Sequence, residues 1–376
     1  MSKCSYSLDT HMTTEHLNDS QIAVATQMAG SIGNLIQMMN DPNLLALASF
    51  LRLRRKKRLP LYTNNQVFVR NDPLQLAKLP DRIGNRSVIK LSDELFFGAI
   101  VGNQRIGTLF LTNNDFAKAL QYDSTLIQRM PLNYIVAWDI DNHHWLHNSL
   151  RLGLYADHYF PAQYTNLGFM VRLLGSHVEC VPLGSCQWDI DFLLSNMNRL
   201  RAERRIESPI GLHGHYQQFS ERNQVVMSWN TVSKNCLLTN DLTYYTNLSQ
   251  SERLTIWTST CTHLIAPVNS DLPFRFYDGL ITRSCLLVPY ELQQQIKLLD
   301  LDQEDQSLLT FYARERLTET YMMNLVKQVK ENWENFRQRQ SKISVARMKE
   351  KIQEHHVADR VDRIFRLVDK MVAEDH

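Results

Sequence analysis

The residues best suited to chemistry stand in one segment, which runs from Asn269 to Pro289. Its pattern predicts a polar loop, a short helix with one apolar face, and a buried strand. Arg275 and Asp278 lie three residues apart on the predicted helix and can share a face. An arginine can hold a phosphate, and a carboxylate can accept hydrogen bonds from ribose hydroxyls. Ser270 or Asp271 can cap this helix; the alternative is an ordinary buried helix with a surface ion pair.

A second polar segment follows the apolar run that ends at Trp138. That run predicts a strand of a parallel sheet, and α/β proteins assemble their sites at the carboxyl ends of such strands. The side chains suit general-base catalysis or the binding of sugar hydroxyls, so we expect catalytic roles for Asp139, Asp141 and His143. The alternative is a polar loop in which Asp141 or Asn142 caps the next helix.

A third candidate is the stretch from Gly211 to Tyr216, where the first predicted strand of the second half ends. Glycines let a backbone approach a ligand closely, so His213 and Gly214 are candidate ligand-binding residues. The stretch has no GxGxxG or Walker pattern, which argues against a dinucleotide or ATP site. Arg222 and Lys234 are nearby cations that could neutralise a leaving phosphate, or they could be ordinary solvated charges.

Two successive α/β sets of elements position these segments. Between residues 61 and 190, apolar runs alternate with helical patterns, which predicts a parallel, doubly wound sheet. A linker helix over 191–205 follows, and a second α/β set occupies 206–290. We expect two domains, with the polar segments facing an open crevice between them. The predicted strands are Gln66 to Arg70, Ser87 to Leu91, Thr108 to Leu111, Tyr134 to Trp138, His158 to Phe160, Val178 to Val181, Pro209 to His213, Cys236 to Thr239, His263 to Ala266 and Cys285 to Val288.

Both ends of the chain predict helices outside the sheets. Residues 1–60 are expected to be a helical N-terminal extension that ends in a basic run, Arg52 to Arg58. The run could meet anionic lipid headgroups, or it could be a solvated helix end whose cations suit the helix dipole. Residues 291–376 carry amphipathic stripes that need a partner surface: the first half, a second copy or a membrane complex. We expect His355 and His356, between two stripes, at the surface.

Composition narrows the class of protein. With 376 residues, 44% apolar and 21% charged, the chain is long enough for two globular domains. A net charge of +2 gives no general case for a nucleic-acid partner. No apolar run approaches the roughly 20 residues of a membrane helix. Six cysteines without a CxxC pair indicate free thiols and no metal site. We therefore expect a protein of the cytoplasm, either free or at the inner face of the membrane.

The segment from Asn269 to Pro289 resembles the donor-site segment of GT-B glycosyltransferases. In that family a polar loop precedes an Arg-aromatic-aromatic-acid helix, a small residue and an apolar strand. This sequence departs from the family in having Asp278 for the usual Glu, and Arg283 and Ser284 for the small residue and Gly before the strand. The resemblance covers about Ile206 to Pro289, and the first half matches the family only in pattern.

The resemblance implies an α/β fold of two Rossmann-like domains facing a cleft, with no obligatory metal or cofactor. A nucleotide sugar would be the donor co-substrate, held at its phosphate by Arg275 and at its ribose by Asp278. The loop Asn269, Ser270 and Asp271 would contact the sugar or phosphate. The pair Asp139 and Asp141 also has the Asp-x-Asp spacing of the metal site in the other major glycosyltransferase fold, GT-A, but we favour the GT-B interpretation. The acceptor would be a glycan or a lipid-linked glycan.

Members of this family that act in the cytoplasm often build bacterial surface polysaccharides. The sequence therefore predicts a glycosyltransferase of lipopolysaccharide or capsule biosynthesis, with a peripheral membrane, assembly-complex or homo-oligomer contact as further partners. A non-catalytic nucleotide-sugar-binding or scaffold protein with the same fold is the main alternative. A DNA-modifying glycosyltransferase is a third, and the small net charge counts against it.

Overall fold

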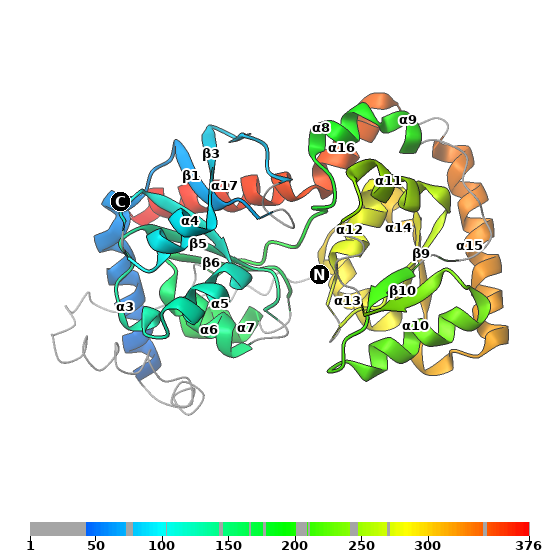
Figure 1. The fold of residues 1–376 in the computed structure, drawn as a ribbon, viewed down its shortest axis with the longest axis horizontal. Coiled ribbons are helices and arrows are strands. Elements are labelled where there is room, and N and C mark those ends of the chain that lie inside the picture. Colours follow the sequence, from blue (N-terminus) through cyan, green and yellow to red (C-terminus); the bar gives the residue numbers. More distant parts are fainter. Residues whose placement is uncertain are drawn as a thin grey trace, which may run out of the picture.

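The computed structural model shows an α/β fold with one six-stranded sheet, two small parallel sheets and a set of C-terminal helices (Figure 1). None of the helices in the described part of the chain is both long and apolar enough to cross a membrane. The structure describes residues 43–72, 78–102, 104–142, 146–164, 167–175, 178–200, 209, 211–240, 247–268, 271–340 and 344–375.

The six-stranded sheet is mostly parallel and has the order β2-β3-β1-β4-β5-β6. Only the short edge strand β2 pairs antiparallel, with β3. The chain passes from β3 across β1 to β4, so the strand order reverses beside β1, which is the Rossmann-like arrangement expected from the sequence. The strands are β1 (Gln66–Arg70), β2 (Arg82–Ile83), β3 (Arg86–Leu91), β4 (Thr108–Thr112), β5 (Tyr134–Asp139) and β6 (His158–Pro161).

Helices cover both faces of this sheet, because its inner strands are apolar on both sides. On β4, Leu109 and Leu111 join the core under the N-terminal helices, whereas Phe110 joins the core under the last helix of the chain. Thr112 and Asp115 form a capping box that starts α5 directly after β4. The helices of the first half are α3 (Asn43–Arg58), α4 (Asp93–Ile100), α5 (Asn113–Tyr122), α6 (Leu146–Tyr155) and α7 (Leu167–Leu174), with the short turns η1 (Leu59–Leu61) and η3 (Leu126–Gln128).

The second half contains the sheets β7-β8 and β11-β10-β9, all with parallel pairing. The two sheets lie close together, since a side chain placed on Gly211 in β7 would lie 3.2 Å from Leu264 Cβ in β9. Strands and helices are β7 (Gly211–Gly214), α10 (Ser220–Val232), β8 (Cys236–Thr239), α11 (Gln250–Ser259), β9 (Thr262–Leu264), α12 (Phe274–Ile281), β10 (Cys285–Pro289), η4 (Tyr290–Leu292), α13 (Gln293–Leu298), α14 (Gln303–Gln306) and β11 (Leu309–Tyr312).

The C-terminal helices connect the two halves. After η5 (Arg314–Arg316), α15 (Glu319–Gln340) runs along the outer side of the second half, and α16 (Val345–His355) lies beside α8 (Ile190–Ser195) (Figure 1). The last helix, α17 (Val357–Asp375), returns to the six-stranded sheet, where Phe365 packs on Phe110 with ring centroids 5.6 Å apart. The apolar stripe of α17 therefore packs on the first half of the same chain, which is one of the three partner surfaces that the sequence left open.

Three sequence expectations need correction, and one strand of the second half was not predicted. Val178 to Val181 is not a strand; Val178 makes only an isolated bridge to Tyr159. The linker helix is interrupted at Asn196, giving α8 (Ile190–Ser195) and α9 (Met197–Leu200), and residues 201–205 lie outside the described residues. The strand β11 was not expected. Both histidines expected at the surface, His355 and His356, are buried.

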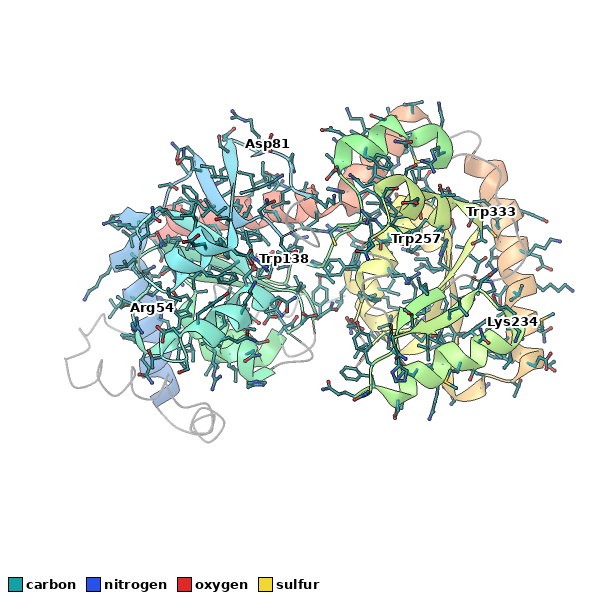
Figure 2. The ribbon with its side chains drawn as sticks, in the orientation of Figure 1. Arg54, Asp81, Trp138, Lys234, Trp257 and Trp333 are labelled. Carbon is teal, nitrogen blue, oxygen red and sulfur yellow. The ribbon has the colours of Figure 1, made fainter. Side chains whose placement is uncertain are left out.

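Half of the basic run at the end of α3 contacts the rest of the protein, whereas Arg52, Lys56 and Lys57 are exposed. Arg58 forms an ion pair with Asp157 and donates to two backbone carbonyls. Arg54 donates to the carbonyls of Leu154 and Ala156, near the end of α6, and is labelled in Figure 2. These contacts stabilise the attachment of α3 to the sheet, so the solvated helix end that the sequence favoured describes only the exposed half of the run.

Candidate functional site

The carboxyl ends of β7 and β9 carry a cluster of cationic side chains. Arg222, on the first turn of α10, donates from Nη1 to the carbonyl of Gly214 at 2.6 Å and from Nε to that of Ala266 at 3.1 Å. Its Nη2 lies 3.2 Å from Nδ1 of His213. Because a guanidinium only donates, Nδ1 accepts, and the neutral imidazole carries its proton on Nε2. Arg222 thus connects the carboxyl end of β7 with the segment that follows β9.

His213 is a poor general acid in this setting. Burial, with the positive charges of Arg275 and Arg222, holds the pKa of His213 well below its usual range. Burial also lowers the pKa of Arg222. A desolvated group of positive charges next to polar backbone is an environment that favours an anion. This cluster therefore suits the binding of a phosphate better than proton transfer.

Arg275 belongs to the same cluster, but its guanidinium binds to the backbone of β7 and does not project beyond the strand ends. It is the second residue of α12, and its Nη2 donates to the carbonyl of Leu212 in β7 at 2.6 Å. Its guanidinium lies 5.3 Å from the ring centroid of Trp257 in α11. Arg275 is half-buried. The structure therefore brings Arg275, His213 and Arg222 together, as the sequence predicted.

The loop before α12 turns tightly at Asp271. The Asp271 carboxylate accepts from the backbone N–H of Val268 at 2.7 Å, and the Asp271 N–H donates to the Val268 carbonyl at 3.0 Å. Its side chain is thereby used for this turn, and α12 begins after Pro273 without the side-chain cap that we expected from Ser270 or Asp271. Asn269 and Ser270 lie outside the described residues.

Asp278 is not at an open surface. It is 2% exposed, and its Oδ1 accepts from the hydroxyl of Ser185 at 2.6 Å. Burial raises the pKa of Asp278 to about 7, against the opposing effects of Ser185 and Arg275. The expectation of an accessible ribose-binding carboxylate is corrected in this respect: the side chain points into the joint between α12 and the segment after Val178, because that segment covers this face of the helix.

The carboxylates after β5 are also held by the protein. Asp139 is fully buried and accepts from the hydroxyl of Tyr159 at 2.7 Å, and burial raises the pKa of Asp139 to about 6. Asp141 is half-buried, and Asn113 donates to its Oδ2 at 3.0 Å. Of the three predicted catalytic residues, His143 lies outside the described residues. Asp141 is therefore the more accessible of the two described carboxylates.

Gln163, which follows β6, joins the two halves of the protein at the carboxyl edge of the six-stranded sheet. This role was not predicted from the sequence. Its side-chain amide donates to the carbonyl of Leu272 at 3.2 Å and accepts from the Leu272 N–H at 3.1 Å. Its backbone makes a similar pair of hydrogen bonds with the amide of Asn142. Gln163 follows the predicted strand His158 to Phe160, so the rule that sites form at carboxyl strand ends could have found it.

Lys234 does not join the other predicted residues. It stands in the turn before β8, at the amino end of that strand, whereas Gly214 and Arg222 lie at the carboxyl ends. In Figure 2 it lies on the side of the second half away from the six-stranded sheet. Because parallel strands all point the same way, a residue that precedes one strand cannot share an edge with residues that follow the others.

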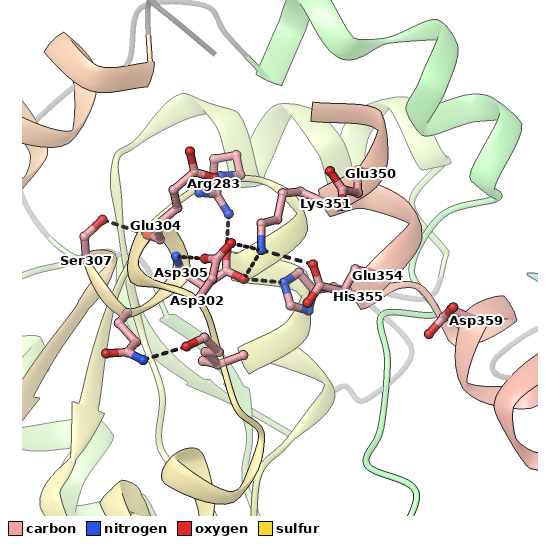
Figure 3. A network of polar contacts seen from close by, with 12 residues as sticks. Arg283, Asp302, Glu304, Asp305, Ser307, Glu350, Lys351, Glu354, His355 and Asp359 are labelled. Carbon is pink, nitrogen blue, oxygen red and sulfur yellow. Dashed lines mark hydrogen bonds and ion pairs between the residues drawn. The ribbon is translucent and has the colours of Figure 1, made fainter. Parts of the chain in front are cut away.

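A second polar cluster, shown in Figure 3, could in principle hold a metal. One ligand atom each of Asp305, Glu354 and His355 lies within 4.8 Å of the others. However, the ammonium of Lys351 lies 2.7 Å from Asp305 and 3.0 Å from Glu354, and Arg283 also pairs with Asp305. A second cation at this place would be repelled at short range. The cluster therefore reads as a buried ion-pair network that holds α16 to the second half.

Comparison with known proteins does not assign the chain to a family. No family model matches it, and no curated protein matches it. The fold class rests on the architecture itself, which is α/β with Rossmann-like parallel sheets.

Proposed function

We propose that this protein is a glycosyltransferase of the GT-B type, which moves a sugar from a nucleotide to a glycan or lipid-linked acceptor. The observation that carries the proposal is the Gln163–Leu272 contact. Through it, the loop of the donor-like segment meets the carboxyl edge of the six-stranded sheet. Donor-binding and acceptor-binding groups would thus meet across this junction, and α17 returns to the first half as the last helix does in GT-B enzymes.

The cationic cluster suits the departing nucleotide. In the reaction, an acceptor hydroxyl forms a bond to the anomeric carbon, the bond to the phosphate oxygen breaks, and the phosphate keeps the electron pair. Arg222 and Arg275 would offset the charge that develops there, which is often the largest contribution to such a rate. The hydroxyl proton would pass to Asp141 or His143. Asp139 and Asp278, expected to take part, are assigned supporting roles because they are buried.

A non-catalytic nucleotide-sugar-binding protein is the second candidate. It is favoured by the burial of Asp139 and Asp278, the two carboxylates that the sequence placed in catalysis and ribose binding. The two candidates differ in turnover. Incubation with UDP-, GDP-, dTDP-, ADP- and CMP-sugars, followed by assay of free nucleotide, should show release with one donor. Binding of a donor without any release of nucleotide would support the second candidate. If no donor is bound and no nucleotide is released, both candidates are excluded.

A further inference from the structure

A pocket of about 600 Å³ lies at the amino edge of the six-stranded sheet, opposite the edge that carries the candidate site. Asn64 and Asn65 line it just before β1, Asn85 and Arg86 line it at the start of β3, and the last turns of α17 close it. Its volume is within the usual range for small-molecule sites.

The floor of the pocket is a closed set of three hydrogen-bonded side chains. The hydroxyl of Tyr62 donates to Oδ1 of Asp369 at 2.6 Å, and Nη2 of Arg86 donates to that hydroxyl at 2.7 Å and to the same carboxylate oxygen. The Arg86 guanidinium also lies 4.9 Å from the ring centroid of Phe365. These contacts fix the three polar groups before any ligand arrives.

The charge of this floor is balanced. Arg86 and Asp369 are the only charged residues among those that the structure describes around the pocket, and they neutralise each other. An anion would gain little from an arginine that is already paired with a carboxylate. The Asp369 side chain is 44% exposed, so its second oxygen is open to a hydroxyl donor.

The rim offers neutral groups that both donate and accept. The side chains of Asn64, Asn65 and Asn85 are exposed, and each amide has one acceptor oxygen and two donor hydrogens. Covering them with an apolar ligand would cost their hydrogen bonds to water. A ligand with several neighbouring hydroxyls would replace those bonds, while Leu59 and Val372 supply apolar wall for its carbon skeleton.

We propose that this pocket binds a neutral sugar unit, separately from the transfer reaction proposed above. Its place at the amino edge puts the length of a strand, typically about 17 to 20 Å, between it and the candidate site. A sugar held there would belong to a different part of a glycan chain, or to a different molecule, from the unit that reacts.

The test uses saturation-transfer NMR on the full chain with glucose, galactose, mannose and N-acetylglucosamine at millimolar concentrations, and with inorganic phosphate as competitor. At least one sugar should bind, and phosphate should not displace it. The double variant Asn65→Ala/Asn85→Ala should weaken binding about tenfold, since a net hydrogen bond contributes a few-fold in affinity. Asn324→Ala, an exposed residue of α15, is the matched control and should bind like the wild type.

Three results would overturn the proposal: binding of none of the four sugars, displacement by phosphate, or equal binding by the double variant and the Asn324→Ala control. Both asparagines are exposed and keep their backbone hydrogen bonds as alanines, so unfolding midpoints should match and confirm that the variants fold. Arg275→Ala separates this site from the donor site. Loss of sugar binding in that variant alone would assign the sugar to the donor site instead.

Discussion

At the scale of single residues, Arg283 holds an unusual backbone conformation just after α12. Its φ is +55°, a left-handed conformation that glycine adopts most easily at the end of a helix. The chain places an arginine there because the side chain reaches Asp305 and lies 5.3 Å from the ring centroid of Phe336. The strain of this backbone conformation is thus offset by a buried ion pair.

Substitution of Arg283 separates these two effects. Arg283→Gly relieves the backbone but removes a partner of the buried Asp305 carboxylate, so we expect a net loss of about 2 to 4 kcal/mol in the free energy of unfolding. Asp300, exposed and with φ +52°, is the matched control, and Asp300→Gly should stay within about 1 kcal/mol of the wild type. Urea unfolding measures both; equal effects would contradict this account.

Asp278 should make stability depend on pH. Its pKa in the folded protein is raised to about 7, so the folded chain keeps a proton that the unfolded chain releases near pH 4. The free energy of unfolding from this group therefore falls as pH rises from about 4 to 7, and then stays constant. Asp278→Asn mimics the neutral carboxyl and should be more stable than the wild type at pH 8, but not at pH 4.

The measurement for Asp278 is urea unfolding at pH 4 and pH 8. Asp81→Asn is the control, because the Asp81 side chain is 95% exposed and lies 3.9 Å from the ammonium of Lys90 (Figure 2). It should change stability little and equally at the two pH values. The idea fails if Asp278→Asn shifts stability by the same amount at both pH values.

At the scale of elements, the local pattern was enough for much of the fold. The strands Gln66–Arg70 and Cys236–Thr239 are predicted to the residue, because apolar runs and turn residues mark their ends. The strand Leu309–Tyr312 could not be found this way. It sits in a stretch without glycine or proline to mark its ends, and it forms by pairing with β10.

The loops at the carboxyl edges are coupled through Gln163. Gln163→Ala leaves the buried N–H and carbonyl of Leu272 without their partners, which should cost about 2 to 4 kcal/mol of stability. The amide hydrogen of Leu272 should also exchange with solvent faster. Gln224→Ala, on the exposed side of α10, is the control and should leave that exchange rate unchanged. Unaltered exchange at Leu272 in Gln163→Ala would argue that the contact does not persist.

At the scale of the whole molecule, the sequence predicted amphipathic C-terminal helices but left their partner open. Their apolar stripes are local, whereas the surface they cover is set by contacts across hundreds of residues, such as Arg55 with Asp375. The same limit applies to the candidate site. The pattern of strand ends predicted that Arg222 and His213 lie near each other, but it did not predict that Asp278 and Asp139 are buried. The position of Lys234 before β8 puts it at the other edge.

The return of α17 should be a main support of the fold. Phe365 is fully buried against Phe110 and beside Arg86, so Phe365→Ala should lower the free energy of unfolding by about 3 to 5 kcal/mol. Arg366→Ala is the neighbouring control: its side chain is 66% exposed and pairs with Asp362 at the surface, so the loss should be under about 1 kcal/mol. Thermal unfolding monitored by circular dichroism would detect the difference, and similar values for both variants would contradict the packing.

The central claim is that the cations at the ends of β7 and β9 bind an activated sugar, and titration calorimetry with nucleotide sugars tests it most directly. One donor should bind the wild type, Arg275→Ala should weaken that binding at least tenfold, and Lys234→Ala, at the opposite edge, should leave it unchanged. A wild-type protein that binds no nucleotide sugar, or an equal loss in the two variants, would contradict the claim.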